Sequence, residues 1–146
     1  MQVLRLLHDQ DPSPVGIGVR VLLLSPDGEA SEIVQRLQRL GGQVEVVDEV
    51  FTALSQVLDD PVGYGLFVLD CDTVNLGGLD GGMRAVHMMG ELVSRVPVIL
   101  VSSDTGEQRF PEDRLMPTQL RAPLSALSLR IGFEHALRER LAYRDM

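Results

Sequence analysis

Short apolar runs alternate with amphipathic segments along most of the chain. The runs at 19–24, 66–69 and 96–101 are apolar at nearly every position, a pattern typical of strands whose two faces are both covered. Shorter runs at 44–47 and 118–120 predict two further strands. The sequence therefore predicts five strands, each separated from the next by a segment of different character.

Most of the intervening segments carry apolar residues at helical spacing. From Glu29 to Leu40 the apolar residues fall on one face and the charged residues on the other, and a glycine pair follows, as at many helix ends. Similar patterns predict helices at 51–58, 83–93 and 124–141. We therefore expect four helices beside the five strands.

Two segments interrupt this alternation. Residues 71–82 are rich in glycine and lack apolar periodicity, so we expect a long, flexible loop there. Residues 102–116 are polar, contain Pro111 and precede Pro117. Because proline disrupts a helix interior, the fourth helix of the alternating pattern is expected to be shortened or broken.

Strands that alternate with helices favour an α/β fold, a flavodoxin-like, doubly wound, five-stranded parallel sheet. The 146 residues are a common size for one domain with a substantial core. We expect this domain at 19–146. Prolines and glycines at the end of residues 1–18 indicate an N-terminal extension.

Charge and composition exclude several classes of function. A net charge of −8 argues against a nucleic-acid surface, which needs clustered basic residues. No apolar run approaches the length of a membrane span, and the first residues do not resemble a secretory signal, so we expect a cytoplasmic protein without membrane contact. The single cysteine, Cys71, excludes an internal disulfide.

Candidate chemistry lies where the predicted strands end. Asp27, Asp70 and Ser102 each stand just after or at the end of such a strand, and ligand sites of doubly wound sheets gather at these carboxyl ends. An aspartate or serine after a strand also has a purely structural use, because its side chain caps a turn. Both interpretations stay open for each of the three residues.

The element order from Val19 to Leu141 resembles the receiver domains of two-component response regulators. The best local match is Leu-Phe-Val-Leu-Asp, which ends at Asp70, and a second is Pro-Val-Ile-Leu-Val-Ser-Ser, which contains Ser102. The resemblance implies that Asp70 stands at the phosphoacceptor position. It also implies that Ser102 stands at the position of the switch hydroxyl.

The departures from the family matter as much as the matches. Where receivers carry an acidic pair, this chain has Ser25 and Pro26, with Asp27 nearby, and Ala122 stands where the family has a lysine. Arg121 precedes Ala122, but neighbouring side chains of an extended segment point to opposite sides, so Arg121 is not expected to replace the ammonium. The chain therefore resembles a degenerate receiver, a pseudo-receiver.

Metal binding depends on whether the receiver pocket works. Phosphorylation of a carboxylate needs a divalent cation held by several carboxylates, and a fixed cation that stabilises the transferring group. Asp27, Asp70 and Asp72 are the candidate Mg²⁺ ligands, and they are expected to bind the ion weakly if they bind it at all. No other cofactor is expected.

The preferred functional interpretation is a non-enzymatic, stand-alone receiver-like protein that acts in signal transduction through protein contacts, without conventional phosphorylation. The expected partner is a kinase, another receiver or a transcription regulator, and the last strand and helix are a candidate homodimer interface. One alternative is a working receiver in which Asp70 accepts phosphate in a phosphorelay. Another is a small-ligand binder or enzyme on the same scaffold, which fold alone does not support.

Overall fold

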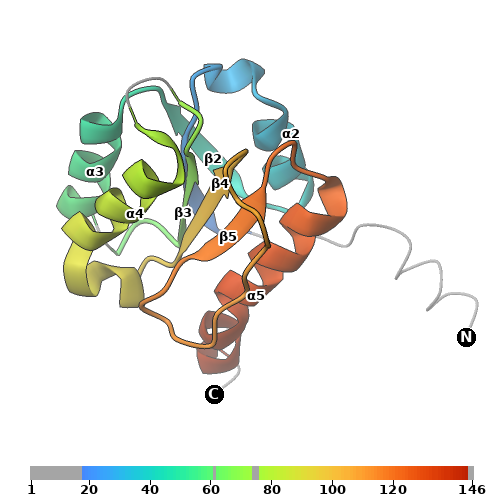
Figure 1. Cartoon of the computed structure of the whole chain (residues 1–146). Helices are drawn as coiled ribbons and strands as arrows, with labels where there is room; N and C mark the ends of the chain where they lie inside the picture. The colour runs from blue at the N-terminus through green and yellow to red at the C-terminus, as the bar shows by residue number, and fades with distance from the viewer. Residues whose placement is uncertain (1–17, 61, 74–75, 145–146) are drawn as a thin grey trace, which may run out of the picture.

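The computed structural model describes residues 18–60, 62–73 and 76–144 and contains a five-stranded parallel sheet between two layers of helices (Figure 1). The strand order is β2-β1-β3-β4-β5, which confirms the predicted flavodoxin-like, doubly wound sheet. The strands are β1 (Arg20–Leu24), β2 (Gln43–Val47), β3 (Leu66–Asp70), β4 (Val98–Ser102) and β5 (Thr118–Arg121). Residues 1–17 of the predicted extension and residues 145–146 of the predicted domain lie outside the described residues.

Helices cover both faces of the sheet. The α-helices are α2 (Glu32–Arg39), α3 (Val50–Asp59), α4 (Gly78–Met89) and α5 (Ala126–Arg144), and the 3-10 helices are η1 (Gly28–Ala30) and η2 (Gly90–Ser94). α2 and α5 pack on one face, and α3 and α4 on the other (Figure 1). No described helix is long and apolar enough to cross a membrane.

The apolar runs of the sequence follow from this double coverage. In β3, Leu66 and Val68 point into the layer of α2 and α5, whereas Phe67 and Leu69 point into the layer of α3 and α4. All four side chains are fully buried. A strand in the middle of such a sheet has no solvent face, so it cannot alternate apolar with polar residues.

The predicted start of the first helix is wrong by three residues. Gly28–Ala30 forms a 3-10 turn, and the α-helix begins only at Glu32. Ser31 sets this boundary, because its hydroxyl accepts a hydrogen bond from the amide of Ile33 at 3.2 Å and so caps the first turn.

The predicted flexible loop at 71–82 is also partly wrong, because α4 already begins at Gly78. Its glycines serve close packing. A Cβ at Gly81 would overlap the carbonyl oxygen of Leu76, and a Cβ at Gly82 would press on the sulfur of Cys71 and on Leu100. Glycine weakens a helix in isolation, but at these positions only glycine lets the helix approach its neighbours.

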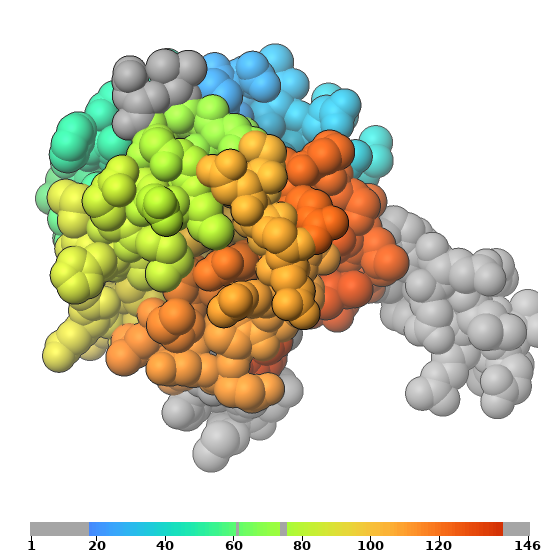
Figure 2. Space-filling model, viewed as in Figure 1, coloured from blue at the N-terminus to red at the C-terminus, as the bar shows by residue number. Residues whose placement is uncertain are grey.

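No helix forms between β4 and β5 in the described residues 103–117, where we predicted a shortened or broken one. Residues 108–116, called the strap here, instead run over the surface between α4 and α5 (Figure 2). Arg109 pairs in antiparallel fashion with Gln119 of β5, with both backbone hydrogen bonds at 2.9 Å. The carbonyl oxygen of Pro111 accepts hydrogen bonds from His135 Nε2 at 2.6 Å and from Arg138 at 3.2 Å.

A polar cluster links β1 and β2 to the segment that precedes β3. The Arg20 guanidinium lies 4.4 Å from the centre of the Tyr64 ring and binds Glu45 at 2.7 Å and Asp60 at 3.2 Å. The Tyr64 hydroxyl donates to Glu45 at 2.6 Å. Burial, together with this hydrogen bond to Glu45, raises the pKa of Tyr64 to about 12. The phenol therefore stays protonated and acts as a donor.

Tyr64→Phe is expected to lower the free energy of unfolding by about 1 kcal/mol at neutral pH, because Glu45 loses a hydrogen bond. Hydrogen bonds from Tyr64 and Arg20 lower the pKa of Glu45 in the folded state. The stabilisation is therefore complete above the ordinary pKa of 4.5 and is lost as pH falls through the lower, folded value. Urea denaturation of parent and variant at neutral and acidic pH measures this difference. An equal loss at both pH values would contradict the role of ionised Glu45, and Gln56→Met is the control that removes only the longer 3.3 Å contact.

Gly81→Ala is expected to destabilise the fold by about 1–3 kcal/mol, because the overlap with Leu76 outweighs the better helix propensity of alanine. Gly106→Ala is the matched control, since nothing lies within 4 Å of its added Cβ. Thermal and chemical denaturation of both variants measure the effect. A Gly81→Ala protein as stable as the parent would show that the glycines of α4 are there for flexibility after all.

Candidate functional site

Asp70 is the last residue of β3 and lies at the carboxyl edge of the sheet, between the ends of β1 and β4. Its carboxylate is half-buried and accepts a hydrogen bond from the Asp72 amide at 3.1 Å. Burial raises the pKa of Asp70 most, and the charges of Asp72 and Asp27 raise it further, against the lowering effect of that amide. The structure thus brings three predicted site residues into electrostatic contact, and all three are acidic.

Asp72 has a structural partner that the sequence did not reveal. Its two carboxylate oxygens accept hydrogen bonds from the Ser103 amide at 3.1 and 3.2 Å, and one also accepts from the Ser103 hydroxyl at 3.1 Å. The Ser102 hydroxyl lies 3.4 Å from the same oxygen. The side chain that we predicted as a metal ligand therefore joins the segment after β3 to the segment after β4.

Ser102, at the predicted switch position, is fully buried and bound on two sides. Its hydroxyl oxygen accepts a hydrogen bond from the Asp104 amide at 3.0 Å, and the hydroxyl faces Asp72. Asp104 in turn accepts from the amide of Leu79, in the first turn of α4, at 3.5 Å. Asp104 was missed by the sequence analysis, because its partner lies 25 residues away.

The position of the acidic pair holds no carboxylate. Ser25 is fully buried, and its amide donates to the carbonyl of Val47 at 2.9 Å. The Ser25 hydroxyl accepts a hydrogen bond from the Asp27 amide at 3.4 Å, which closes the turn after β1. Pro26 and Asp27 are exposed. Of this stretch only Asp27 contributes a negative charge to the surroundings of Asp70.

The position at which receivers carry a lysine also holds an uncharged residue, Ala122. Ala122 packs against the apolar layer of α2 and α5, and its amide donates to the Ser102 carbonyl at 3.0 Å. Arg121 is exposed and donates through Nε to the carbonyl of Thr105 at 3.0 Å. All 13 basic residues of the sequence are arginine, so no lysine from elsewhere in the chain supplies the ammonium.

The described carboxylates do not form a three-ligand metal group. Among the side chains that the structure describes, no group of three or more His, Cys, Asp or Glu residues is arranged to hold a metal ion. Both oxygens of Asp72 accept hydrogen bonds from the segment after β4. Weak binding of Mg²⁺ by Asp27, Asp70 and Asp72 stays a prediction, and it would have to use fewer than three of these carboxylates at a time.

Cys71, beside Asp70, is no nucleophile in this setting. Burial, followed by the charges of Asp70 and Asp72, raises the pKa of its thiol to about 12. The thiolate is the reactive form of cysteine. The thiol therefore stays protonated at neutral pH and packs in the layer of α3 and α4 as a small apolar group.

Several solved structures of signalling proteins have a fold similar to that of this chain. A response regulator receiver domain protein from Clostridium thermocellum is 18% identical, with a TM-score of 0.62, over 85% of this chain and 98% of that one. A sensor protein from Polaromonas sp. JS666 is 21% identical, with a TM-score of 0.64, over 84% and 98%. The receiver domain of an Arabidopsis thaliana histidine kinase, solved with Mg²⁺ and BeF₃⁻, is 18% identical, with a TM-score of 0.59, over 84% and 92%.

These similarities establish a receiver-like fold for the chain. No protein-family model matches the sequence, and no curated protein matches it either. The conclusion therefore rests on the arrangement of strands and helices, and any function has to be argued from the site itself.

Asp72→Ala is expected to lower the free energy of unfolding by about 1–2 kcal/mol, because the Ser103 amide and two serine hydroxyls lose their acceptor. The segment after β4 should then open more often, so its amides should exchange hydrogen faster. Hydrogen–deuterium exchange over residues 102–105 measures this, with Glu107→Ala, an exposed acid nearby, as control. Unchanged exchange in Asp72→Ala would show that the link between the two segments does not hold them.

Proposed function

We propose that this chain is a receiver-like signalling protein that acts through protein–protein contacts, without conventional phosphorylation of Asp70. One observation carries the proposal. The charges that shift the pKa of Asp70 are those of Asp72 and Asp27, both negative, and the sequence contains no lysine to supply the family's ammonium.

The electrostatics of the site argue against phosphoryl transfer. A phosphoryl group on Asp70 brings roughly two negative charges at neutral pH. The charges of Asp27 and Asp72 already raise the pKa of Asp70, and a phosphoryl group would meet the same repulsion. Proteins that transfer or accept phosphoryl groups offset the negative charge of the phosphoryl group with a metal ion and a fixed cation. This site offers neither a three-ligand metal group among its described side chains nor a lysine.

The hydrogen bonds of Ser102, at the switch position, also argue against a phosphoryl switch. A hydroxyl that responds to a phosphoryl group has to be free to turn toward it. Ser102 is buried and held between Asp72 and the Asp104 amide. Its hydrogen bonds stabilise the loops in one arrangement, which suits a fixed contact surface better than a switch.

One observation favours the alternative, in which Asp70 accepts phosphate in a phosphorelay. The carboxylate is only half-buried, and one of its oxygens accepts no hydrogen bond from a described residue. That oxygen is thus available to react. The two hypotheses differ in whether a small phosphate donor leaves a phosphoryl group on Asp70.

Contacts with partners are proposed for the helical surfaces. Leu127 and Ile131, one turn apart on α5, are 67% and 44% exposed, and exposed apolar groups of this size favour association. The strap pairs with β5 at Arg109 and Gln119 and so occupies part of that strand's outer edge. We therefore assign the proposed homodimer to α5 and leave β5 out. A kinase, another receiver or a transcription regulator in the cytoplasm is the proposed heterologous partner.

An enzyme or small-ligand binder is the weaker proposal. The described residues at the carboxyl edge contain no activated nucleophile, since the Cys71 thiol is protonated and Ser102 faces an acid that is itself hydrogen-bonded to Ser103. A hollow between α2 and α5 is lined by residues of these two helices and by Leu40, and none of the predicted site residues lines it. We therefore propose a non-enzymatic role.

Intact mass spectrometry after incubation with acetyl phosphate and Mg²⁺ tests the proposal. We expect no phosphate adduct on the parent protein or on Asp70→Asn, while a complete receiver in the same tube is labelled. An adduct on the parent that is missing from Asp70→Asn would overturn the proposal and make Asp70 a true phosphoacceptor. An adduct on both proteins would place the reaction at another residue and leave Asp70 unmodified.

A further inference from the structure

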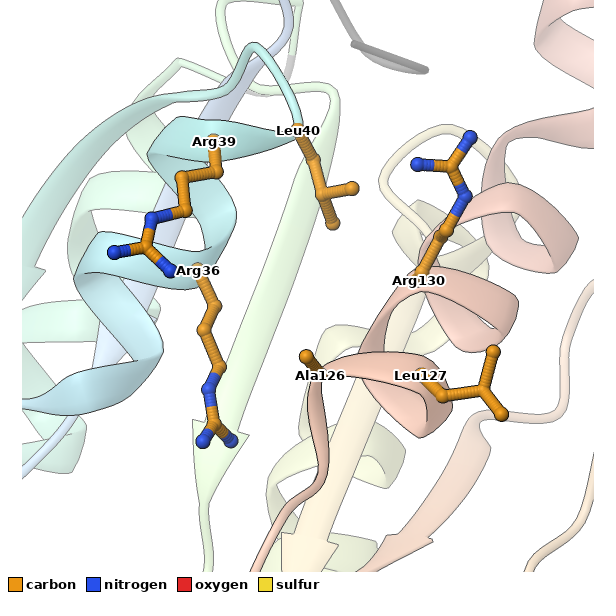
Figure 3. Close-up of a pocket in the computed structure, with 6 residues that line it drawn as sticks. All are labelled: Arg36, Arg39, Leu40, Ala126, Leu127 and Arg130. Atoms are coloured by element: carbon orange, nitrogen blue, oxygen red, sulfur yellow. The ribbon is translucent and has the colours of Figure 1, made fainter. Parts of the chain in front are cut away.

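A hollow of about 220 Å³ lies between α2 and α5. Apolar and basic side chains from both sides line it (Figure 3). We call it the α2–α5 groove, and its lining residues are Arg36, Arg39, Leu40, Ala126, Leu127 and Arg130.

The groove carries positive charge in a protein whose net charge is −8. Arg36 lies 3.7 Å from Glu32 and donates to the Leu124 carbonyl, and Arg130 lies 3.3 Å from Glu134. Arg39 is exposed and makes no ion pair or hydrogen bond with another described side chain. One guanidinium at this groove is therefore available to an acidic group.

The apolar part of the groove is incompletely covered. Leu40 lies on its floor and points toward α5, whereas Leu127 lies on its rim (Figure 3). Leu40 is already buried, but Leu127 is 67% exposed, although burial of its apolar side chain would be favourable. An occupant that combines apolar and acidic side chains would match both parts of the groove.

The chain itself enters beside this groove. The Gly18 amide donates to the carbonyl of Gly41 at 3.2 Å, and Gly41 directly follows Leu40. The next contact, from the Gln43 amide to the Val19 carbonyl at 2.8 Å, fixes the start of β1 along β2. Residues 1–17 therefore join the described part of the chain one residue away from the groove floor.

The sequence of that segment has the required chemistry. Four of its apolar residues, Val3, Leu4, Leu6 and Leu7, precede Asp9 and Asp11. Six residues separate Asp11 from Gly18. At about 3.3 Å per residue this length reaches roughly 20 Å, which exceeds the diameter of about 10–12 Å of a helix with its side chains.

We propose that residues 3–11 of this chain occupy the α2–α5 groove. The apolar group covers Leu127 beside the already buried Leu40, and the two aspartates face Arg39. Argued from the groove and from the entry of the chain, the inference goes beyond the proposed function and does not depend on it. It makes the N-terminal segment a competitor for any partner that binds this side of the molecule.

A nitroxide label on the full chain tests the proposal. Cys71 is fully buried with a protonated thiol, so Gln2→Cys provides the reactive site for the label. In a ¹⁵N-labelled sample, we expect the label to broaden the amide signals of Leu40 and of residues 126–130 selectively. Arg39→Glu should weaken docking by about fivefold, and Leu127→Ser by about tenfold, so both should reduce the broadening.

Arg95→Glu is the matched control, since Arg95 is an exposed arginine that follows η2 on the other side of the sheet. It should leave the broadening unchanged. Broadening spread over the whole surface, or unaffected by Arg39→Glu and Leu127→Ser, would overturn the proposal. So would selective broadening in a mixture of labelled ¹⁴N protein and unlabelled ¹⁵N protein, because the occupant would then be the segment of a second copy.

Discussion

Double coverage of the sheet is the constraint on which the other features of this molecule depend. β3 has a neighbouring strand on each side and a helical layer on each face, so its side chains up to Leu69 are fully buried. Asp70 is the first residue of this strand to reach solvent, and it does so only in part. Burial is therefore the largest cause of the raised pKa of Asp70, and the charges of neighbouring residues add to it.

Hydrogen bonds hold the acidic side chains at the carboxyl edge of the sheet in place. Asp72 is satisfied by Ser103 and Ser102, and Asp104 by the first turn of α4. These contacts tie the loops after β3 and β4 to each other and to a helix. Asp72, which we predicted as a metal ligand, thus holds the segments after β3 and β4 together.

The sequence predicted the layers well and the contacts between distant segments poorly. A strand that is covered on both faces has apolar residues at consecutive positions of the sequence. The strands and the class of sheet were therefore predictable. The start of α4 was not, because the glycines at 78–82 look flexible until Leu76 and Cys71 are seen against them. Pro111 correctly indicated a disrupted helix, but its partner His135 lies 24 residues away. Asp72 and Ser103 are likewise 31 positions apart in the sequence, and no local sequence pattern predicts a contact between such distant residues.

The strap has a further consequence for how the protein behaves at high concentration. The open edges of a sheet invite strands of other chains, and this is a common route to fibres and aggregates. At β5 the antiparallel pair of Arg109 and Gln119 takes up hydrogen-bonding groups of the edge. At the opposite edge, β2 carries the charged Glu45 and is only five residues long. The irregular segment between β4 and β5 thus protects the sheet against open-ended growth through that edge.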